Sequence, residues 1–288
     1  MTTFTSGDDV TTSVETIQWP PWTNIGDLVS YGTSGMVLGL DVVLKVPHRS
    51  SERRFIDVEK QVYERLANGH DGILRYYGPL HDGLLLQHAA HLQIRSILAQ
   101  EDIKAPFSSL SLRVRWIRQI VEAVVFVHSK GILHCDISCN NVFVDNDFDA
   151  KLGDFAGSSI DGSEPLVCYE TRYSHPRDES VSIRSEIFAL GSTMYEILTG
   201  SRPYNDLEDA DIEKAYQLEQ YPDLERLKAF KTVIANCWTA RYQTVDELLR
   251  DVNAQGDSIL HSVFVCQLTI SSCGDCGHIA TNIDSHVA

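Results

Sequence analysis

The stretch HCDISCNN, residues 134–141, decides the fold of this chain together with DFAG, residues 154–157. Asp136 carries a carboxylate that can orient a hydroxyl group and accept its proton. Asn141 and Asp154 offer oxygen atoms of the kind that Mg²⁺ prefers as ligands. Side chains of these types at these spacings can surround a metal-bound triphosphate, which indicates phosphoryl-transfer chemistry.

Both stretches resemble motifs of the eukaryotic protein kinase family, in which the catalytic loop reads HRDxxxxN and the metal-binding loop reads DFG. Here they read HCDxxxxN and DFAG. An isolated HxDxxxxN is a weak match because these residue types are common in turns, but both motifs at the family's spacing are a strong one. The resemblance implies that Asp136 is the catalytic base, that Asn141 and Asp154 are metal ligands, and that ATP and Mg²⁺ are the cofactors.

Residues 30–37, SYGTSGMV, resemble the family's glycine-rich loop with Ser30 in place of the first glycine. Gly32 and Gly35 lack a Cβ, so a turn built on them can approach phosphate groups closely. The same pattern alone is an ordinary hairpin signal. Its position ahead of a lysine-bearing strand favours the phosphate loop, and the resemblance implies that Gly32, Gly35 and Val37 bind the nucleotide.

Residues 41–47, DVVLKVP, predict a strand that alternates about Lys45. A lone lysine on an edge strand is usually solvated. A lysine among apolar neighbours in a buried strand instead needs a charged partner. The segment resembles the family's VAIK strand, whose lysine binds the phosphates of the nucleotide, so the resemblance implies this role for Lys45.

The partner of Lys45 is expected on a helix over residues 55–66, where apolar residues form one stripe. Glu59 falls where the family places the glutamate that pairs with the strand lysine. Asp57 and Glu64 are the alternatives, and each is otherwise an ordinary charge on a solvated helix face. We expect Glu59 to be the partner and, with Lys45, to belong to the catalytic set.

Four segments of the C-terminal half follow the order of the kinase family. Residues 112–129 predict a long buried helix like αE, 185–200 resemble αF, Cys237-Trp238 matches the pair before the last helices, and 244–252 fits the closing helix. The resemblance therefore covers about residues 24–255.

The resemblance implies an α+β, bilobal protein-kinase-like fold, in which a small antiparallel β-sheet lobe carries one main helix and the larger lobe is mainly helical. We expect a flexible N-terminal leader over residues 1–23 and a poorly ordered C-terminal tail over 256–288, where the helical pattern fades. The kinase-like domain, 24–255, is expected to divide into a small lobe over 24–87, a hinge over 87–90 and a large lobe over 91–255.

Leu84-Leu85-Leu86 predicts the strand before the hinge, which makes Leu86 the expected gatekeeper of the cleft. The backbone at His88 and Ala89 is then expected to meet the adenine edge. The full set of nucleotide-binding residues implied by the resemblance is Gly32, Gly35, Val37, Val43, Lys45, Leu86, His88, Ala89 and Phe143.

Composition limits the classes of function. The chain has 288 residues, 43% of them hydrophobic, so one domain can bury a full core. The formal net charge of −16 argues against a nucleic-acid partner or an anionic membrane surface, because both require clustered Lys and Arg. The sequence has no membrane span or signal peptide, and its seven cysteines form no secreted framework. A cytoplasmic protein with a protein substrate is expected, and its oligomeric state is left open.

Several departures from the family pattern bear on activity. Cys135 replaces the catalytic-loop arginine that in many kinases receives an activation-loop phosphate, so a switch of that kind is not expected. Ser138 replaces a lysine that contacts the transferring phosphate, and its neutral hydroxyl cannot supply the same field. Val43 replaces a small alanine and is expected to crowd the purine. Ala156 replaces the DFG glycine, whose flexible role Gly157 is expected to take over.

Two further departures concern the scaffold. Glu186 replaces the αF aspartate and keeps its charge. Arg177 replaces the glutamate of the APE motif, and Tyr242 stands about where its arginine partner is expected. Because both members of one buried ion pair are absent together, we expect repacking and not damage.

Three functions are compatible with these residues. The first is an ATP-dependent protein kinase that phosphorylates Ser or Thr hydroxyls slowly, and the second is a pseudokinase that binds nucleotide or partner proteins without significant turnover. The third is a small-molecule phosphotransferase. The activation segment from Asp154 to Pro176, where a peptide substrate would dock, argues against the third. The presence of all five expected catalytic residues favours the first: Lys45, Glu59, Asp136, Asn141 and Asp154.

Overall fold

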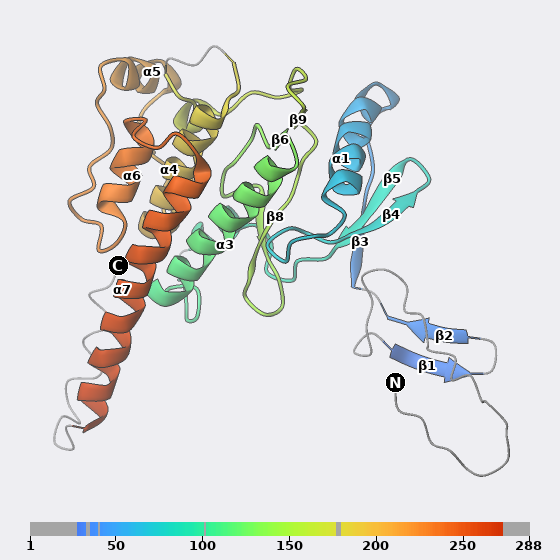
Figure 1. Ribbon diagram of the computed structural model, residues 1–288, viewed down its shortest axis with the longest axis horizontal. Helices are drawn as coiled ribbons and strands as arrows, with labels where there is room; N and C mark the ends of the chain where they lie inside the picture. The colour runs from blue at the N-terminus through green and yellow to red at the C-terminus, as the bar shows by residue number, and fades with distance from the viewer. Residues whose placement is uncertain (1–27, 33–34, 40, 101, 177–179, 273–288) are drawn as a thin grey trace, which may run out of the picture. The chain divides into compact units, whose positions relative to one another are not determined.

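The computed structural model (Figure 1) describes residues 28–32, 35–39, 41–100, 102–176 and 180–272. The chain divides into two units, Met1–Asp41 and Val42–Ala288. In the first unit, β1 (Leu28–Gly32) pairs antiparallel with β2 (Gly35–Leu38), so that Gly32 stands opposite Gly35. This is the hairpin predicted from the glycine spacing. The leader over 1–23 and Arg177 lie outside the described residues.

The second unit begins with an antiparallel sheet of three strands, β3 (Val42–Lys45), β4 (Tyr76–Leu80) and β5 (Gly83–Gln87), in the order β3-β5-β4. Val43 stands opposite Leu86 in the register of β3 and β5. A short turn of 3₁₀ helix, Ser50–Glu52, leads from β3 into α1 (Arg53–Leu66).

Helix α1 buries one face and lies beside β5 (Figure 1). The buried residues Ile56, Val62 and Leu66 recur at helical spacing, and Glu59 lies on the same face. Ile56, and not the half-buried Phe55, occupies the first turn of this stripe. The helix ends where Ala67 adopts a left-handed backbone conformation.

The remainder of the second unit is mainly helical, as the family resemblance implied. Its helices are α2 (Ile94–Leu98), α3 (Leu110–Ser129), α4 (Ile183–Thr199), α5 (Asp209–Gln217), α6 (Lys231–Trp238) and α7 (Val245–Ser272). Short antiparallel pairs of strands hold the loops between α3 and α4: β6 (Ile132–Leu133) with β9 (Ser159–Ile160), and β7 (Val142–Val144) with β8 (Ala150–Leu152). A 3₁₀ turn, η3 (Thr171–Tyr173), precedes α4.

Helix α4 is the central buried helix, since most of its residues are inaccessible to solvent. It begins with a capping box in which Ser182 and Ser185 each accept a hydrogen bond from the other's backbone N–H. Its neighbour α6 approaches closely at Gly191, where an added Cβ would lie 2.6 Å from the Cβ of Cys237. The indole of Trp238 donates a hydrogen bond of 3.1 Å to the Ser192 hydroxyl and fixes this contact.

Helix α7 extends well beyond the closing helix expected over 244–252, and it runs alongside α3 (Figure 1). Gly256 does not end the helix. It lies within it, where an added Cβ would come within 2.9 Å of the Arg118 guanidinium of α3. Ile259 and Leu260 pack against the core and continue the apolar face of the helix. Residues 256–272 of the expected tail are thus helical, and residues 273–288 lie outside the described residues. No helix within the described ranges combines the length and apolar character needed to cross a membrane.

We predict that Gly191→Ala destabilises the protein by about 2 kcal/mol. Overpacking costs about 1–3 kcal/mol, and the value is high here because the Cβ of Cys237 cannot rotate away. The gain in helix propensity offsets about 1 kcal/mol of it. Urea unfolding followed by circular dichroism measures the difference. Glu213→Ala on the exposed face of α5 is the control and is expected to change stability by less than about 0.5 kcal/mol. An unchanged or more stable Gly191→Ala protein would contradict the close packing of α4 and α6.

Candidate active site

Lys45 and Glu59 form an ion pair between the sheet and α1. Lys45 Nζ lies 2.6 Å from Glu59 Oε2, and the Glu59 side chain is fully buried. The alternatives named from the sequence lie on the exposed face of α1, where Asp57 is 3.9 Å from Arg53 and Glu64 is 3.7 Å from Lys60. The structure therefore pairs Lys45 with Glu59, the glutamate that the family resemblance implied.

Asp154 completes this network from the loop after β8. Its Oδ1 lies 2.7 Å from Lys45 Nζ, and its backbone is left-handed with φ of 57°. The next residue, Phe155, is buried against the rings of Tyr63 and His134, and its N–H donates to Glu59 Oε1 at 3.3 Å. Lys45 thus contacts a carboxylate from each side of the cleft.

The two carboxylates determine the charge state of Lys45. Burial lowers the pKa of this amine, but the charges of Glu59 and Asp154 outweigh burial, so the net shift of the Lys45 pKa is upward. The lysine therefore stays positively charged at neutral pH. A permanent positive charge at this end of the cleft suits a polyphosphate.

The loop over residues 134–141 lies between β6 and β7 and is fixed by short contacts. Asn141 Nδ2 donates to Asp136 Oδ2 at 2.8 Å and to the Asp136 carbonyl at 2.7 Å. The N–H of Gly153, next to Asp154, donates to the Asn141 carbonyl at 2.9 Å. His134 contacts the Gly153 carbonyl through Nε2, also at 2.9 Å. These bonds bring the two motifs of the sequence together.

Burial and neighbouring groups shift the pKa of the Asp136 carboxyl. Burial raises the pKa of Asp136, nearby His134 and the hydrogen bond from Asn141 lower it, and the charges of Asp154 and Glu170 raise it, so that the net shift is upward. Carboxylates that repel one another this way are suited to a shared cation. Asp136, Asn141 and Asp154 offer only oxygen donors, so their chemistry fits Mg²⁺.

A cavity of about 320 Å³ lies beside Lys45 and Asp154, within the range typical of small-ligand sites. Its lining contains most of the predicted nucleotide-binding residues: Val43, Lys45, Leu86, His88, Ala89 and Phe143. Glu59 and Asp154 close its polar end. The walls also include four residues that the sequence did not single out: Leu44, Leu74, Leu92 and Gln93. A larger cavity of about 470 Å³, beside α3 and Leu260, contains none of the predicted residues.

Some predicted residues do not line this cavity. Asp136 and Asn141 are not among its lining residues, although the Asn141 carbonyl accepts from the N–H of Gly153, the residue before Asp154. Gly32, Gly35 and Val37 belong to the hairpin of the first unit. Their predicted role at the nucleotide therefore stays a prediction.

The departures from the family pattern have structural consequences at this site. Cys135 is buried, and its thiol donates to the Leu133 carbonyl at 3.3 Å. Burial, reinforced by the charge of Glu186, raises the pKa of this thiol to about 12, so it carries no charge. The buried hydroxyl of Ser138 accepts from the N–H of Asn140 at 3.3 Å and so serves its own loop.

Gly157 matters for space. An added Cβ would lie 2.1 Å from a methyl group of Val167, so the glycine lets the two arms of the segment meet. Its φ is not in the left-handed region, and the flexible role expected for it has no support here.

Tyr242 stands about where the family's arginine is expected, and its hydroxyl donates to Asp251 at 2.7 Å. The position therefore makes a polar contact within the helical part.

The αF position is held by Glu186, which is fully buried in α4. It accepts from the Cys135 N–H at 2.7 Å and from the Tyr169 hydroxyl at 3.2 Å, and it also contacts His128. Burial raises the pKa of Glu186, but the contact with His128 and the hydrogen bond from the Cys135 N–H outweigh burial, so the net shift of this pKa is downward. The Glu186 carboxylate is therefore ionised, and its hydrogen bond with the Cys135 N–H holds the catalytic loop against α4.

Comparison with known proteins agrees with this geometry. The model of the protein kinase domain matches residues 36–256. Serine/threonine-protein kinase PDK1 of Cryptococcus neoformans var. grubii is 26% identical over 156 residues, which are 50% of this chain and 13% of that protein. Aurora kinase of Schizosaccharomyces pombe is 28% identical over 178 residues, 59% of this chain and 50% of the relative.

A probable cell cycle serine/threonine-protein kinase, the CDC5 homolog of Encephalitozoon cuniculi, is 30% identical over 116 residues, 37% of this chain and 25% of that protein. The chain thus covers half or less of the length of these relatives. The family model nevertheless covers most of the chain, from the second strand of the hairpin into α7. This chain belongs to the protein kinase family.

Proposed function

We propose that this chain is an ATP-dependent protein kinase that transfers the γ-phosphate of Mg-ATP to Ser or Thr hydroxyls of proteins. One observation carries the proposal: Lys45 contacts both Glu59 and Asp154 at the polar end of the cavity, beside the Asp136–Asn141 pair. These contacts support assigning phosphoryl transfer to Lys45, Glu59, Asp136, Asn141 and Asp154, all of which belong to the second unit.

Each residue is assigned a role that its surroundings support. Lys45 binds phosphate oxygens and is held in place by Glu59. Asn141 and Asp154 hold Mg²⁺, which when bound neutralises charge on the phosphates. Asp136 orients the substrate hydroxyl and accepts its proton. The hydrogen bond from Asn141 leaves the other oxygen of Asp136 for that contact.

The nucleotide's base is assigned to the apolar part of the cavity, between Val43, Leu86, Ala89 and Phe143. The backbone at His88 and Ala89 is assigned to its hydrogen-bonding edge. Gly32, Gly35 and Val37 are assigned to the phosphates because of their glycine pattern. We assign residues 24–255 to the catalytic domain, a range close to the one that the family model matches.

Slow turnover is part of the proposal. Ser138 offers no positive charge to the transferring phosphate, and losing one such donor costs about 10²–10³ in rate. The same feature, together with Val43, favours the second candidate, a pseudokinase that binds nucleotide or partner proteins without significant turnover. We place either function in the cytoplasm, where Mg-ATP is abundant and the free thiols of Cys135, Cys139, Cys168 and Cys237 persist.

We predict that the purified protein with Mg²⁺ and labelled ATP phosphorylates itself or a generic Ser/Thr peptide, and that Asp136→Ala lowers the rate by at least about 10²-fold. The loss follows from removing the group that accepts the hydroxyl proton. Asp147→Ala is the matched control, since this exposed carboxylate lies in the turn between β7 and β8. Its rate is expected to stay within about twofold of the original.

The outcomes separate the two candidates. Equal labelling of the original protein and Asp136→Ala would show that Asp136 is not the base. Stabilisation of the fold by nucleotide, with no transfer by any variant, would favour the pseudokinase. Chelation of Mg²⁺ with EDTA is expected to abolish transfer, and undiminished transfer would contradict the metal-binding roles of Asn141 and Asp154.

We further predict that Val43→Ala raises the affinity for a non-hydrolysable ATP analogue by about 3- to 10-fold. Val43 stands opposite Leu86 in the cavity wall, and removing two methyl groups relieves the expected crowding of the base. Calorimetry measures the change, with Val46→Ala as a control of the same chemistry outside the cavity lining. Equal or weaker binding by Val43→Ala would mean that Val43 packs against the base without strain.

A further inference from the structure

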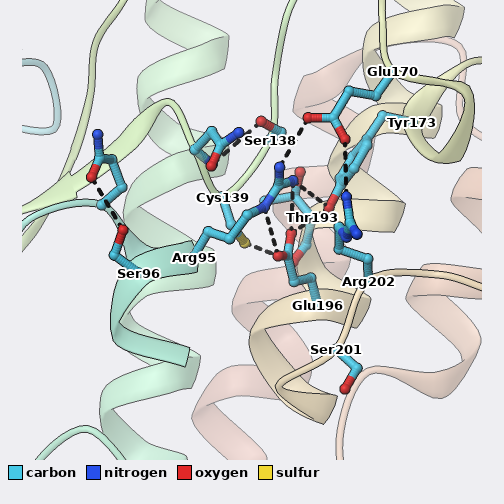
Figure 2. A network of polar contacts seen from close by, with 12 residues as sticks. Arg95, Ser96, Ser138, Cys139, Glu170, Tyr173, Thr193, Glu196, Ser201 and Arg202 are labelled. Atoms are coloured by element: carbon cyan, nitrogen blue, oxygen red, sulfur yellow. Dashed lines mark hydrogen bonds and ion pairs between the residues drawn. The ribbon is translucent and has the colours of Figure 1, made fainter. Parts of the chain in front are cut away.

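The guanidinium of Arg95, at the start of α2, uses all three of its nitrogens (Figure 2). Nε donates to Glu196 Oε1 at 2.9 Å, Nη1 donates to Glu170 Oε1 at 2.9 Å, and Nη2 donates to the Tyr173 hydroxyl at 2.9 Å. Glu196 belongs to α4, whereas Glu170 and Tyr173 belong to the activation segment. Arg95 therefore joins this segment to the central helix.

The backbone of the same residue contacts the catalytic loop. The N–H of Arg95 donates to the carbonyl of Cys139 at 3.1 Å. Cys139 in turn lies three residues from Asp136 in the sequence, and its thiol donates to the Thr193 carbonyl of α4 at 3.8 Å. One residue thus connects the catalytic loop, α4 and the activation segment.

This junction is mostly shielded from solvent. The Arg95 side chain is 18% exposed and that of Glu196 is 3% exposed. Tyr173 is fully buried, and its hydroxyl donates to the second oxygen of Glu196. A planar guanidinium with paired donors fixes direction as well as distance, which a flexible ammonium group does not.

Glu170 is the exposed end of the junction. Its carboxylate is 39% exposed and also lies 3.7 Å from Arg202, a surface residue that contacts neither Glu196 nor Tyr173 in the described contacts. The carbonyl of Glu170 accepts from the N–H of Tyr173 at 2.8 Å and so starts η3. Through Glu170, the contact with Arg95 therefore extends to the backbone of the activation segment at η3.

Other contacts of the chain hold the same segment on both flanks. Tyr169 donates to Glu186 at 3.2 Å. Arg172 donates to Asp209 at 3.0 Å and to the Leu207 carbonyl at 2.6 Å.

A phosphate on the activation segment would lack the catalytic-loop guanidinium that many kinases provide for it, because Cys135 stands at that position. The thiol of Cys135 is neutral and buried at the position where a guanidinium would be needed. Ser158 and Ser159, two hydroxyls of the segment, are also buried. Ser163 is exposed, but its hydroxyl accepts from the Ile160 N–H at 2.9 Å and closes a turn.

We propose that Arg95 is a positioning residue which, through Glu170, holds the substrate-docking part of the activation segment in its working conformation without phosphorylation. The carboxylate of Glu170 is the acidic group of the segment that Arg95 holds. This inference rests on the proposed kinase function for its role in turnover, but the tether itself has a readout independent of turnover.

The test uses the full chain, treated with phosphatase and shown by intact mass to carry no phosphate. Glu170→Ala removes the anion, and Arg95→Lys keeps the charge near Glu196 but loses the fork, so the fold is expected to persist. Arg202→Ala is the matched control, because Arg202 contacts Glu170 without reaching α4. Hydrogen exchange of the amides of Tyr173 and Ser174 and the KM for a peptide substrate are measured for each.

We expect exchange at these amides to be about tenfold faster in Glu170→Ala and in Arg95→Lys, as the loss of one charged hydrogen bond implies. The peptide KM is expected to rise about tenfold while the affinity for nucleotide stays within twofold. The double variant is expected to match the single ones, and Arg202→Ala is expected to match the original protein. Phosphatase treatment of the original protein is expected to leave transfer unchanged.

Three results would overturn the inference: unchanged exchange and KM in Glu170→Ala, equal effects of Arg202→Ala and Glu170→Ala, or a loss of transfer after phosphatase treatment. If no form of the original protein transfers phosphate but the exchange pattern is as expected, the tether stands and the proposed function fails. The two failures are therefore distinguishable.

Discussion

The ion pair between Lys45 and Glu59, with Asp154 as a second partner, is the constraint on which the site depends. Glu59 is fully buried, and a buried carboxylate without a partner is strongly destabilising. Its partner comes from the sheet, while Asp154 comes from the loop after β8 in the helical part. Charge compensation thus joins the sheet, α1 and the metal-binding loop at one end of the cavity.

Buried carboxylates recur as junctions elsewhere in the second unit. Glu186 of α4 binds the backbone of the catalytic loop at Cys135, and Glu196 of α4 binds Arg95. Because the formal net charge is −16, acidic side chains outnumber Lys and Arg, and not every carboxylate can pair with a cationic side chain. Glu59, Glu186 and Glu196 each take a donor from a segment distant in sequence, and that donor fixes where the segment lies. The rigid α4 helix becomes the reference for both the catalytic loop and the activation segment.

The family resemblance was sufficient for the partner of Lys45. It implies Glu59 over Asp57 and Glu64, and the helical period agrees, because of these three carboxylates only Glu59 lies on the buried face of α1. The sequence pattern was insufficient at the C-terminal end, where the helical pattern fades from residue 256 but α7 continues to Ser272. Gly256 lies where α7 passes close to α3, and this contact with a neighbouring helix has no signal in the local sequence.

The Arg95 junction could not be predicted from the sequence. Arg95 is separated from Glu170 by 75 positions and from Glu196 by 101, and no period or family motif used above marks any of the three. Ser138 and Cys135 were recognised as departures, but only the structure shows that the Ser138 hydroxyl serves its own loop and that the thiol is sealed from solvent. Long-range polar contacts of this kind depend on the folded arrangement of segments that each follow ordinary local rules.

If the site depends on this ion pair, Glu59 acts on bound phosphates only by holding Lys45. A double-mutant cycle on the affinity for a Mg²⁺-loaded ATP analogue, with Lys45→Met and Glu59→Gln, measures this dependence. We expect each single variant to weaken binding by about tenfold or more and the double variant to bind no more weakly than Lys45→Met alone. Fully additive losses, or unchanged binding by Lys45→Met, would contradict it.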